Sequence, residues 1–145
     1  MNRATNSQEH VRSILVIDDD PADYMFIARS VAKVAPDVLM HYEADGYQAR
    51  ERIADTNADL VILDLKMPGC SGHEVLNDLK NSANENDRVS VPVIVMSSST
   101  DPKDIVSCYL KHANAYVEKP ASIAAYMSLA NSLKDFWLEQ ARVPN

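Results

Sequence analysis

Residues 13–21 read Ser-Ile-Leu-Val-Ile-Asp-Asp-Asp-Pro. The first five residues form a short apolar run rich in branched side chains, which is typical of a strand buried on both faces. Asp20 and Pro21 then match an N-cap followed by proline at the first helical position. This stretch therefore predicts a buried strand that passes directly into a helix, with three carboxylates at the junction.

The same strand-and-helix unit recurs along the chain. The predicted strands are nearly unbroken apolar runs, and helical periodicity follows them. This alternation is typical of a parallel sheet covered by helices on both faces. In such open sheets the ligand site lies beyond the carboxyl ends of the strands. The predicted strands span residues 13–17, 38–43, 59–64, 91–96 and 115–118, and the predicted helices span 21–34, 47–54, 72–80, 102–112 and 122–142.

The composition is that of one globular domain, with 145 residues, 46% hydrophobic and 24% charged. A net charge of −7 argues against a bare nucleic-acid binder, which needs cations to neutralise phosphates. Cys70 and Cys108 lack a CxxC spacing, no apolar run reaches membrane-span length and the start is polar. We therefore expect free thiols and a soluble, cytoplasmic protein without a membrane partner. We predict a polar arm over 1–12, a domain over 13–142 with an extended last helix, and a tail over 143–145.

Polar residues lie at the carboxyl ends of four of the predicted strands: Asp18 and Asp19, then Asp64, Ser97 and Lys119. Like charges about 4 Å apart repel by roughly 4 kcal/mol at an effective dielectric of 20, so the carboxylates need a positive partner. Hard oxygen ligands without histidine or thiol favour Mg²⁺. Together with a hydroxyl and a lysine, they describe a site that receives a phosphoryl group, with Asp64 as the nucleophile.

Four segments carry a family resemblance: Ile-Leu-Val-Ile-Asp-Asp-Asp-Pro (14–21), Asp-Leu-Val-Ile-Leu-Asp-Leu-Lys-Met-Pro-Gly (59–69) with Gly72, Pro-Val-Ile-Val-Met-Ser (92–97), and Tyr-Val-Glu-Lys-Pro (116–120). Together they resemble the receiver domains of two-component response regulators. The resemblance extends from about residue 13 to residue 138. It implies a doubly wound, five-stranded parallel α/β fold of the flavodoxin-like (CheY-like) type, with strand order 2-1-3-4-5.

The resemblance also implies roles for the residues at the strand ends. Asp64 would be the phosphoacceptor. Mg²⁺ would bind Asp64, Asp19 and the backbone carbonyl of Lys66, and Asp18 would act on it mostly through water. Lys119 would neutralise the phosphoryl oxygens. These assignments make the protein a signalling phosphoacceptor that assists its own phosphorylation and dephosphorylation, rather than an enzyme.

A second group of residues would respond to the phosphoryl group in proteins of this family. Ser97 stands where threonine is commoner, and it lacks the methyl group that restricts χ1. Tyr116 matches the aromatic residue that changes rotamer with phosphorylation. Lys66 and Ser99 occupy the two positions that tune dephosphorylation. The family also implies a cis bond between Lys119 and Pro120, whereas X-Pro statistics alone favour trans.

Within the family, the 97–99 Ser-Ser-Ser run, the polar 81–90 segment and the C-terminal 136–138 and 143–144 segments resemble small regulators paired with bacterial phytochromes. The expected partner is therefore a sensor histidine kinase, with a bacteriophytochrome as one candidate, and the downstream protein is not specified. Three consecutive residues of the last helix, Phe136, Trp137 and Leu138, point in directions about 100° apart and cannot all face one core. We expect this segment to form a homodimer interface.

Two other functions remain open. A phosphatase of the haloacid dehalogenase type also uses an aspartyl nucleophile, Mg²⁺, a hydroxyl and a lysine. That class needs a second aspartate two residues after the nucleophile, where this chain has Lys66. A pseudo-receiver that binds partners without accepting phosphate is the other alternative, and the full set of carboxylates together with Lys119 argues against it.

Overall fold

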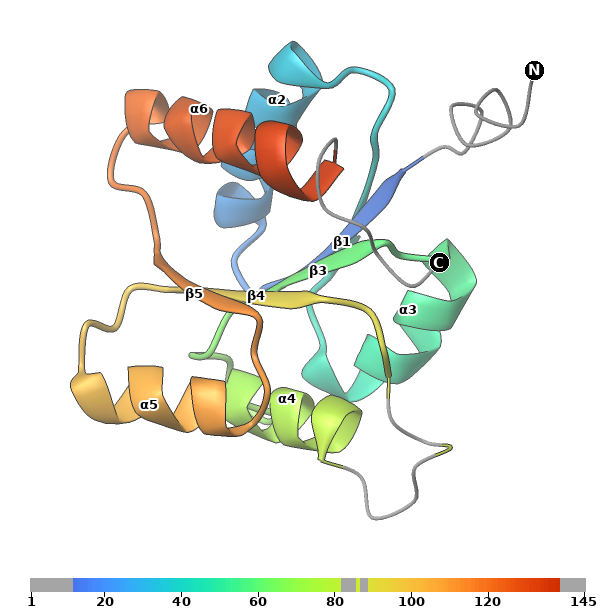
Figure 1. The fold of residues 1–145 in the computed structure, drawn as a ribbon, viewed down its shortest axis with the longest axis vertical. Helices are drawn as coiled ribbons and strands as arrows, with labels where there is room; N and C mark the ends of the chain where they lie inside the picture. The colour runs from blue at the N-terminus through green and yellow to red at the C-terminus, as the bar shows by residue number, and fades with distance from the viewer. Residues whose placement is uncertain (1–11, 82–85, 87–88, 139–145) are drawn as a thin grey trace.

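The computed structural model describes residues 12–81, 86 and 89–138. A parallel five-stranded sheet, with order β2-β1-β3-β4-β5, lies between two layers of helices (Figure 1). This confirms the predicted fold class and strand order. The elements are β1 (Ser13–Ile17), α2 (Pro21–Val34), β2 (Leu39–Glu43), η1 (Gly46–Gln48), α3 (Ala49–Thr56), β3 (Leu60–Leu63), α4 (Gly72–Lys80), β4 (Val93–Ser97), α5 (Pro102–Leu110), β5 (Ala115–Glu118), α6 (Ile123–Ser132) and η3 (Leu133–Leu138).

Each face of the sheet has its own hydrophobic core, because successive side chains of a strand point to opposite faces. In β1, Leu15 and Ile17 pack towards α3, α4 and α5, whereas Ile14 and Val16 pack towards α2 and α6. The three central strands are buried along their whole length. Their continuous apolar sequences follow from this two-sided burial.

Helix caps turn the chain sharply at the carboxyl ends of the strands. The Asp20 side chain accepts a hydrogen bond from the Ala22 backbone and begins α2 directly after β1. Ser71 and Glu74 form a reciprocal capping box at the start of α4. Asp101 caps α5 in the same way as Asp20 caps α2. These short connections place the polar residues of several strands at one edge of the sheet.

Several element boundaries differ from the sequence predictions. The fourth strand begins at Val93 rather than residue 91, and the helix predicted over 47–54 begins with the 3₁₀ turn η1. The last helix loses α-helical hydrogen bonding after Ser132 and continues as the π-helix η3. There the Ser132 hydroxyl donates to the Ser128 carbonyl, a side-chain bond that competes with the backbone ladder.

The cis peptide bond implied by the family is wrong for this structure, since the Lys119–Pro120 bond is trans like all the other described peptide bonds. General X-Pro statistics already favour this outcome. The predicted arm and tail, and residues 139–142 of the predicted last helix, lie outside the described residues. No helix in the described part of the chain is long and apolar enough to cross a bilayer.

Candidate functional site

Three carboxylates meet beyond the ends of β1 and β3. One oxygen from each of Asp18, Asp19 and Asp64 lies within 4.8 Å of the others. Asp18 and Asp64 are only 1% and 3% exposed, whereas Asp19 faces solvent. The Asp20 backbone donates to Asp18 Oδ1 at 2.9 Å, and the Lys66 backbone donates to Asp64 Oδ1 at 3.3 Å. The backbone thus holds both buried side chains in place.

Lys119 brings the positive charge to this cluster from the end of β5. Its backbone donates to the Ser97 carbonyl at 2.8 Å, which fixes the lysine beside β4. The ammonium Nζ lies 3.2 Å from Asp18 Oδ2 and 3.4 Å from Asp64 Oδ2. Its shortest contact, 2.5 Å, is to Oδ2 of Asp23 in the first turn of α2. One lysine therefore contacts three carboxylates.

Sequence analysis did not include Asp23 in this site. The contact joins residues far apart in the chain, so local sequence gives no direct sign of it. The signal that was available is position: Asp23 lies in the first turn of α2, which begins directly after Asp18, Asp19 and the Asp20 cap.

Burial and mutual repulsion shift the pKa values of this cluster. Burial is the main reason that the pKa of Asp18 rises from 3.8 to about 7, and the charge of Asp64 adds to the rise against the Asp20 backbone hydrogen bond. Burial also raises the pKa of Asp64, although the charge of Lys119 opposes it. The pKa of Lys119 is raised because the Asp23 hydrogen bond and the neighbouring carboxylates outweigh its burial. The cluster thus carries more negative charge than one lysine neutralises.

This arrangement fits a divalent cation. Asp18 Oδ2 contacts Lys119 but receives no directed hydrogen bond, so a buried carboxylate oxygen is left without a full partner. Mg²⁺ prefers one or two carboxylates with water and phosphate oxygens, and Asp18, Asp19 and Asp64 provide such ligands. That the backbone carbonyl of Lys66 also binds Mg²⁺ stays a prediction.

The hydroxyl predicted to respond to phosphate lies at the end of β4. Ser97 is fully buried, and its Oγ accepts a hydrogen bond from the Ser99 backbone at 3.1 Å. The Tyr116 hydroxyl donates to the Ser99 carbonyl at 2.8 Å. The Ser99 hydroxyl in turn donates to Asp104 Oδ2 at 2.6 Å. A chain of contacts thus runs from Ser97 through Ser99 to Tyr116 and α5.

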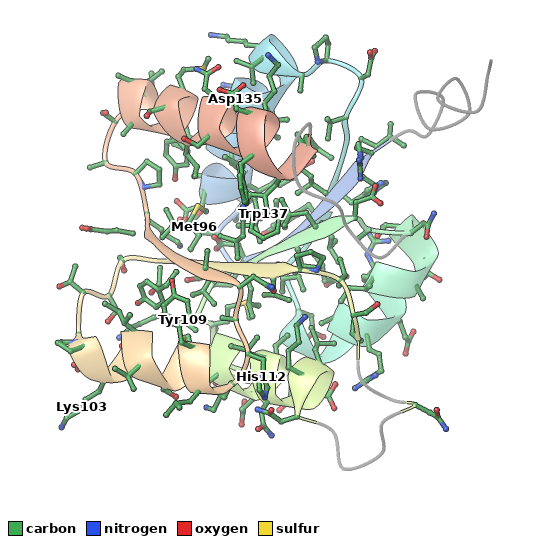
Figure 2. The ribbon with its side chains drawn as sticks, viewed as in Figure 1. Met96, Lys103, Tyr109, His112, Asp135 and Trp137 are labelled. Atoms are coloured by element: carbon green, nitrogen blue, oxygen red, sulfur yellow. The ribbon has the colours of Figure 1, made fainter. Side chains whose placement is uncertain are left out.

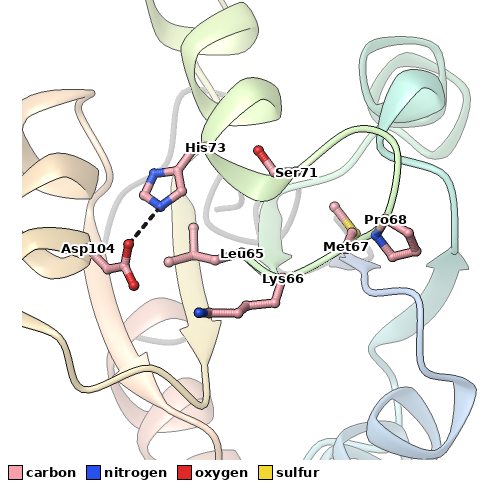
Figure 3. A pocket seen from close by; sticks show the side chains of 7 residues that line it. All are labelled: Leu65, Lys66, Met67, Pro68, Ser71, His73 and Asp104. Atoms are coloured by element: carbon pink, nitrogen blue, oxygen red, sulfur yellow. Dashed lines mark hydrogen bonds and ion pairs between the residues drawn. The ribbon is translucent and has the colours of Figure 1, made fainter.

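A cavity of about 370 Å³ opens beside the loop that follows Asp64. Figure 3 shows Lys66 and the His73–Asp104 pair around it, with His73 on α4 and Asp104 on α5. His73 Nε2 lies 3.1 Å from Asp104 Oδ1. Hydrogen bonds from Ser99 and His73 outweigh partial burial and lower the pKa of Asp104. Sequence analysis gave neither residue a role, because no ligand spacing links them.

The C-terminal aromatic residues divide between core and surface. Trp137 and Leu138 are half-buried against the core under α2 and α6. Trp137 lies on the sheet side of its helix (Figure 2). Phe136 is 54% exposed and meets Trp137 edge to face, with ring centroids 5.2 Å apart. The exposed ring is the part of this segment available to another surface.

Comparison with known proteins identifies a family. The model for the response regulator receiver domain matches residues 14–131. A probable methanogenesis regulatory protein, FilR2 of Methanothrix harundinacea, is 29% identical over 137 residues, covering 90% of this chain and 86% of the relative. Response regulator Rcp1 of Synechocystis is 26% identical over 138 residues, covering 90% and 92%. The phosphorylated cyanobacterial phytochrome response regulator RcpA superposes with a TM-score of 0.81 at 28% identity, covering 94% of this chain and all of that one.

Proposed function

This chain belongs to the response regulator receiver domain family, and we propose that it accepts a phosphoryl group on Asp64 and signals through protein contacts. Receiver domains are signalling proteins, not conventional enzymes. The observation that carries the proposal is the position of Asp64, whose carboxylate lies within 4.8 Å of those of Asp18 and Asp19 and 3.4 Å from the Lys119 ammonium. The solved Mn²⁺-bound form of Rcp1 supports Mg²⁺ as the ion of this acidic cluster.

The proposed reaction is phosphoryl transfer from a phosphohistidine. The P–N bond breaks, its electron pair stays on the imidazole, which takes up a proton, and a P–O bond forms to an Asp64 carboxylate oxygen. A bound Mg²⁺ would neutralise the charge on the phosphoryl oxygens. Asp18 and Asp19 would hold that ion, while Lys119 supplies a second positive group beside Asp64.

The added charge would then act on the contacts around β4. A phosphoryl group carries about −1.5 to −2 charges and three strong acceptor oxygens. The Ser97 hydroxyl would turn to donate to it, and the hydrogen bond from the Ser99 backbone would loosen. Because Ser99 is tied to Tyr116 and Asp104, the shift would reach β5 and α5. We propose the surface of α5, β5 and α6 as the output face.

The proposed partner is a sensor histidine kinase, and a bacteriophytochrome is the candidate favoured by the relatives. RcpA is a phytochrome response regulator. The R. palustris regulator RPA3017, which acts in red light signalling, superposes with a TM-score of 0.79 at 29% identity. Both Cys70 and Cys108 are free and buried thiols, which suits the reducing cytoplasm proposed for this protein.

We expect a small acyl phosphate donor to add one phosphoryl group to the protein, only when Mg²⁺ is present. Intact mass measured over time, beside an Asp64→Asn variant, checks this. The variant is nearly isosteric and should fold, but it lacks the nucleophile. If a folded wild type binds Mg²⁺ but shows no increase in mass, the pseudo-receiver is favoured. If the protein continuously hydrolyses a phosphate ester without a lasting increase in its own mass, the phosphatase is favoured.

We also propose that the protein forms a homodimer through residues 136–138. The half-exposed ring of Phe136 supports this interface, since Trp137 and Leu138 already pack on the core. Equilibrium sedimentation at tens of micromolar should show a dimer for the wild type. Phe136→Ser should shift it to monomer while the far-UV circular dichroism spectrum of the folded domain is kept. A monomeric wild type would refute the interface.

A further inference from the structure

The resting position of Lys119 is set by Asp23 more than by the phosphoacceptor. Charge-assisted N–H···O hydrogen bonds in proteins are commonly about 2.7–2.9 Å long. The Lys119–Asp23 contact, at 2.5 Å, is a hydrogen bond and the shortest of the three, while the contacts to Asp18 and Asp64 are ion pairs at 3.2 and 3.4 Å. The lysine is thus held chiefly by a residue outside the phosphorylation chemistry.

The local structure makes Asp23 a stable holder of the lysine. Asp23 lies in the first turn of α2, where the helix dipole favours a carboxylate. The side chains of Asp23 and Lys119 are only 21% and 17% exposed. Screening by solvent is therefore weaker than at a surface ion pair. The contact joins the N-terminus of α2 to the end of β5.

We propose that Asp23 is a positioning residue that retains Lys119 in the resting state and so slows phosphorylation of Asp64. The inference rests on the proposed phosphoryl transfer. The phosphoryl group arrives at Asp64 and needs the ammonium of Lys119 to contact its oxygens. The incoming group therefore competes with Asp23 for the same cation. The strength of the Asp23 contact sets how readily Lys119 moves.

The test compares Asp23→Asn with Asp20→Asn at saturating Mg²⁺ and a small acyl phosphate donor. Both variants remove one negative charge from the start of α2. Asn remains a good N-cap at residue 20, and the Asp20 side chain bonds the Ala22 backbone instead of Lys119. We expect Asp23→Asn to be phosphorylated on the order of tenfold faster than the wild type, as expected for weakening one charge-assisted hydrogen bond. Asp20→Asn should show only the smaller effect of charge.

A second readout reports the lysine itself without any phosphorylation. The ¹H–¹⁵N spectrum of lysine ammonium groups should show a slowly exchanging Lys119 signal, assigned by its loss in Lys119→Met. That signal should disappear in Asp23→Asn and persist in Asp20→Asn. If it persists in Asp23→Asn, or if the two Asn variants are phosphorylated at equal rates, Asp23 does not retain the lysine. If the wild type accepts no phosphoryl group, the proposed function is wrong, and so is the effect of Asp23 on phosphorylation. The spectrum still shows independently whether Asp23 holds Lys119.

Discussion

In metal-free buffer, the free energy of unfolding of the wild type should fall relative to that of Asp18→Asn as the pH rises from about 4 to about 8. The pKa of Asp18 is raised in the folded protein from 3.8 to about 7, mainly by burial and further by the charge of Asp64. The folded state therefore favours the protonated carboxyl. Its stabilising contribution is complete below 3.8 and is lost as the pH rises through 7.

The expected loss is on the order of 3–4 kcal/mol, since each pKa unit corresponds to about 1.4 kcal/mol between the two protonation states. Asp18→Asn keeps the shape of the side chain and removes the titration. Urea denaturation at several pH values, with EDTA, measures the difference between the two proteins.

Mg²⁺ and a remote aspartate provide the controls for this experiment. Mg²⁺ binds the ionised carboxylates of the folded protein, so it should stabilise the wild type at pH 8 more than it stabilises Asp18→Asn. Asp37→Asn changes an exposed side chain outside the cluster and should follow the wild-type pH profile. If the free energies of unfolding of wild type and Asp18→Asn change in parallel with pH, ionisation of the Asp18 carboxyl does not destabilise the folded protein.

Most of the sheet was predictable because its signals are local and agree with one another. The continuous apolar run specifies the buried strand β1, and the Asp20 cap with Pro21 specifies that α2 begins directly after it. The strand order came from family resemblance, since apolar runs alone do not say which strands pair. Strand ends in a parallel sheet share one edge, so the proximity of Asp18, Asp64 and Lys119 followed once the order was known.

Other features depend on side-chain contacts that local sequence does not encode. The partner of Lys119 in the resting state, Asp23, depends on how α2 is rotated against β5. The His73–Asp104 pair depends on the packing of α4 beside α5. Neither contact follows from spacing within one element. The change to a π-helix after Ser132 was missed because the apolar periodicity of the last helix continues through it.

Gly72→Ala should be the most destabilising single methyl addition near the site. A Cβ at residue 72 would lie 2.1 Å from the Asp64 carbonyl oxygen and 2.6 Å from the Leu65 Cα. Both are backbone atoms and cannot turn aside like a flexible side chain. The Gly72 backbone also donates to the Leu65 carbonyl at 2.9 Å, which holds the two segments together. Relief of the clash would require the loop after β3 to move away from α4.

We expect Gly72→Ala to lower the free energy of unfolding by about 3 kcal/mol or more, measured by urea denaturation. Gly69→Ala provides the matched comparison, since its Cβ would meet nothing nearer than a Tyr47 ring carbon at 3.9 Å and its φ is +82°. Its cost should be only the roughly 1–2 kcal/mol of a left-handed backbone. Because the clash at Gly72 falls on the backbone of Asp64, Gly72→Ala should also slow phosphoryl uptake, whereas Gly69→Ala should leave it near the wild-type rate. If Gly72→Ala and Gly69→Ala lower the free energy of unfolding equally, the loop after β3 can move at little cost. In that case α4 does not fix the position of Asp64.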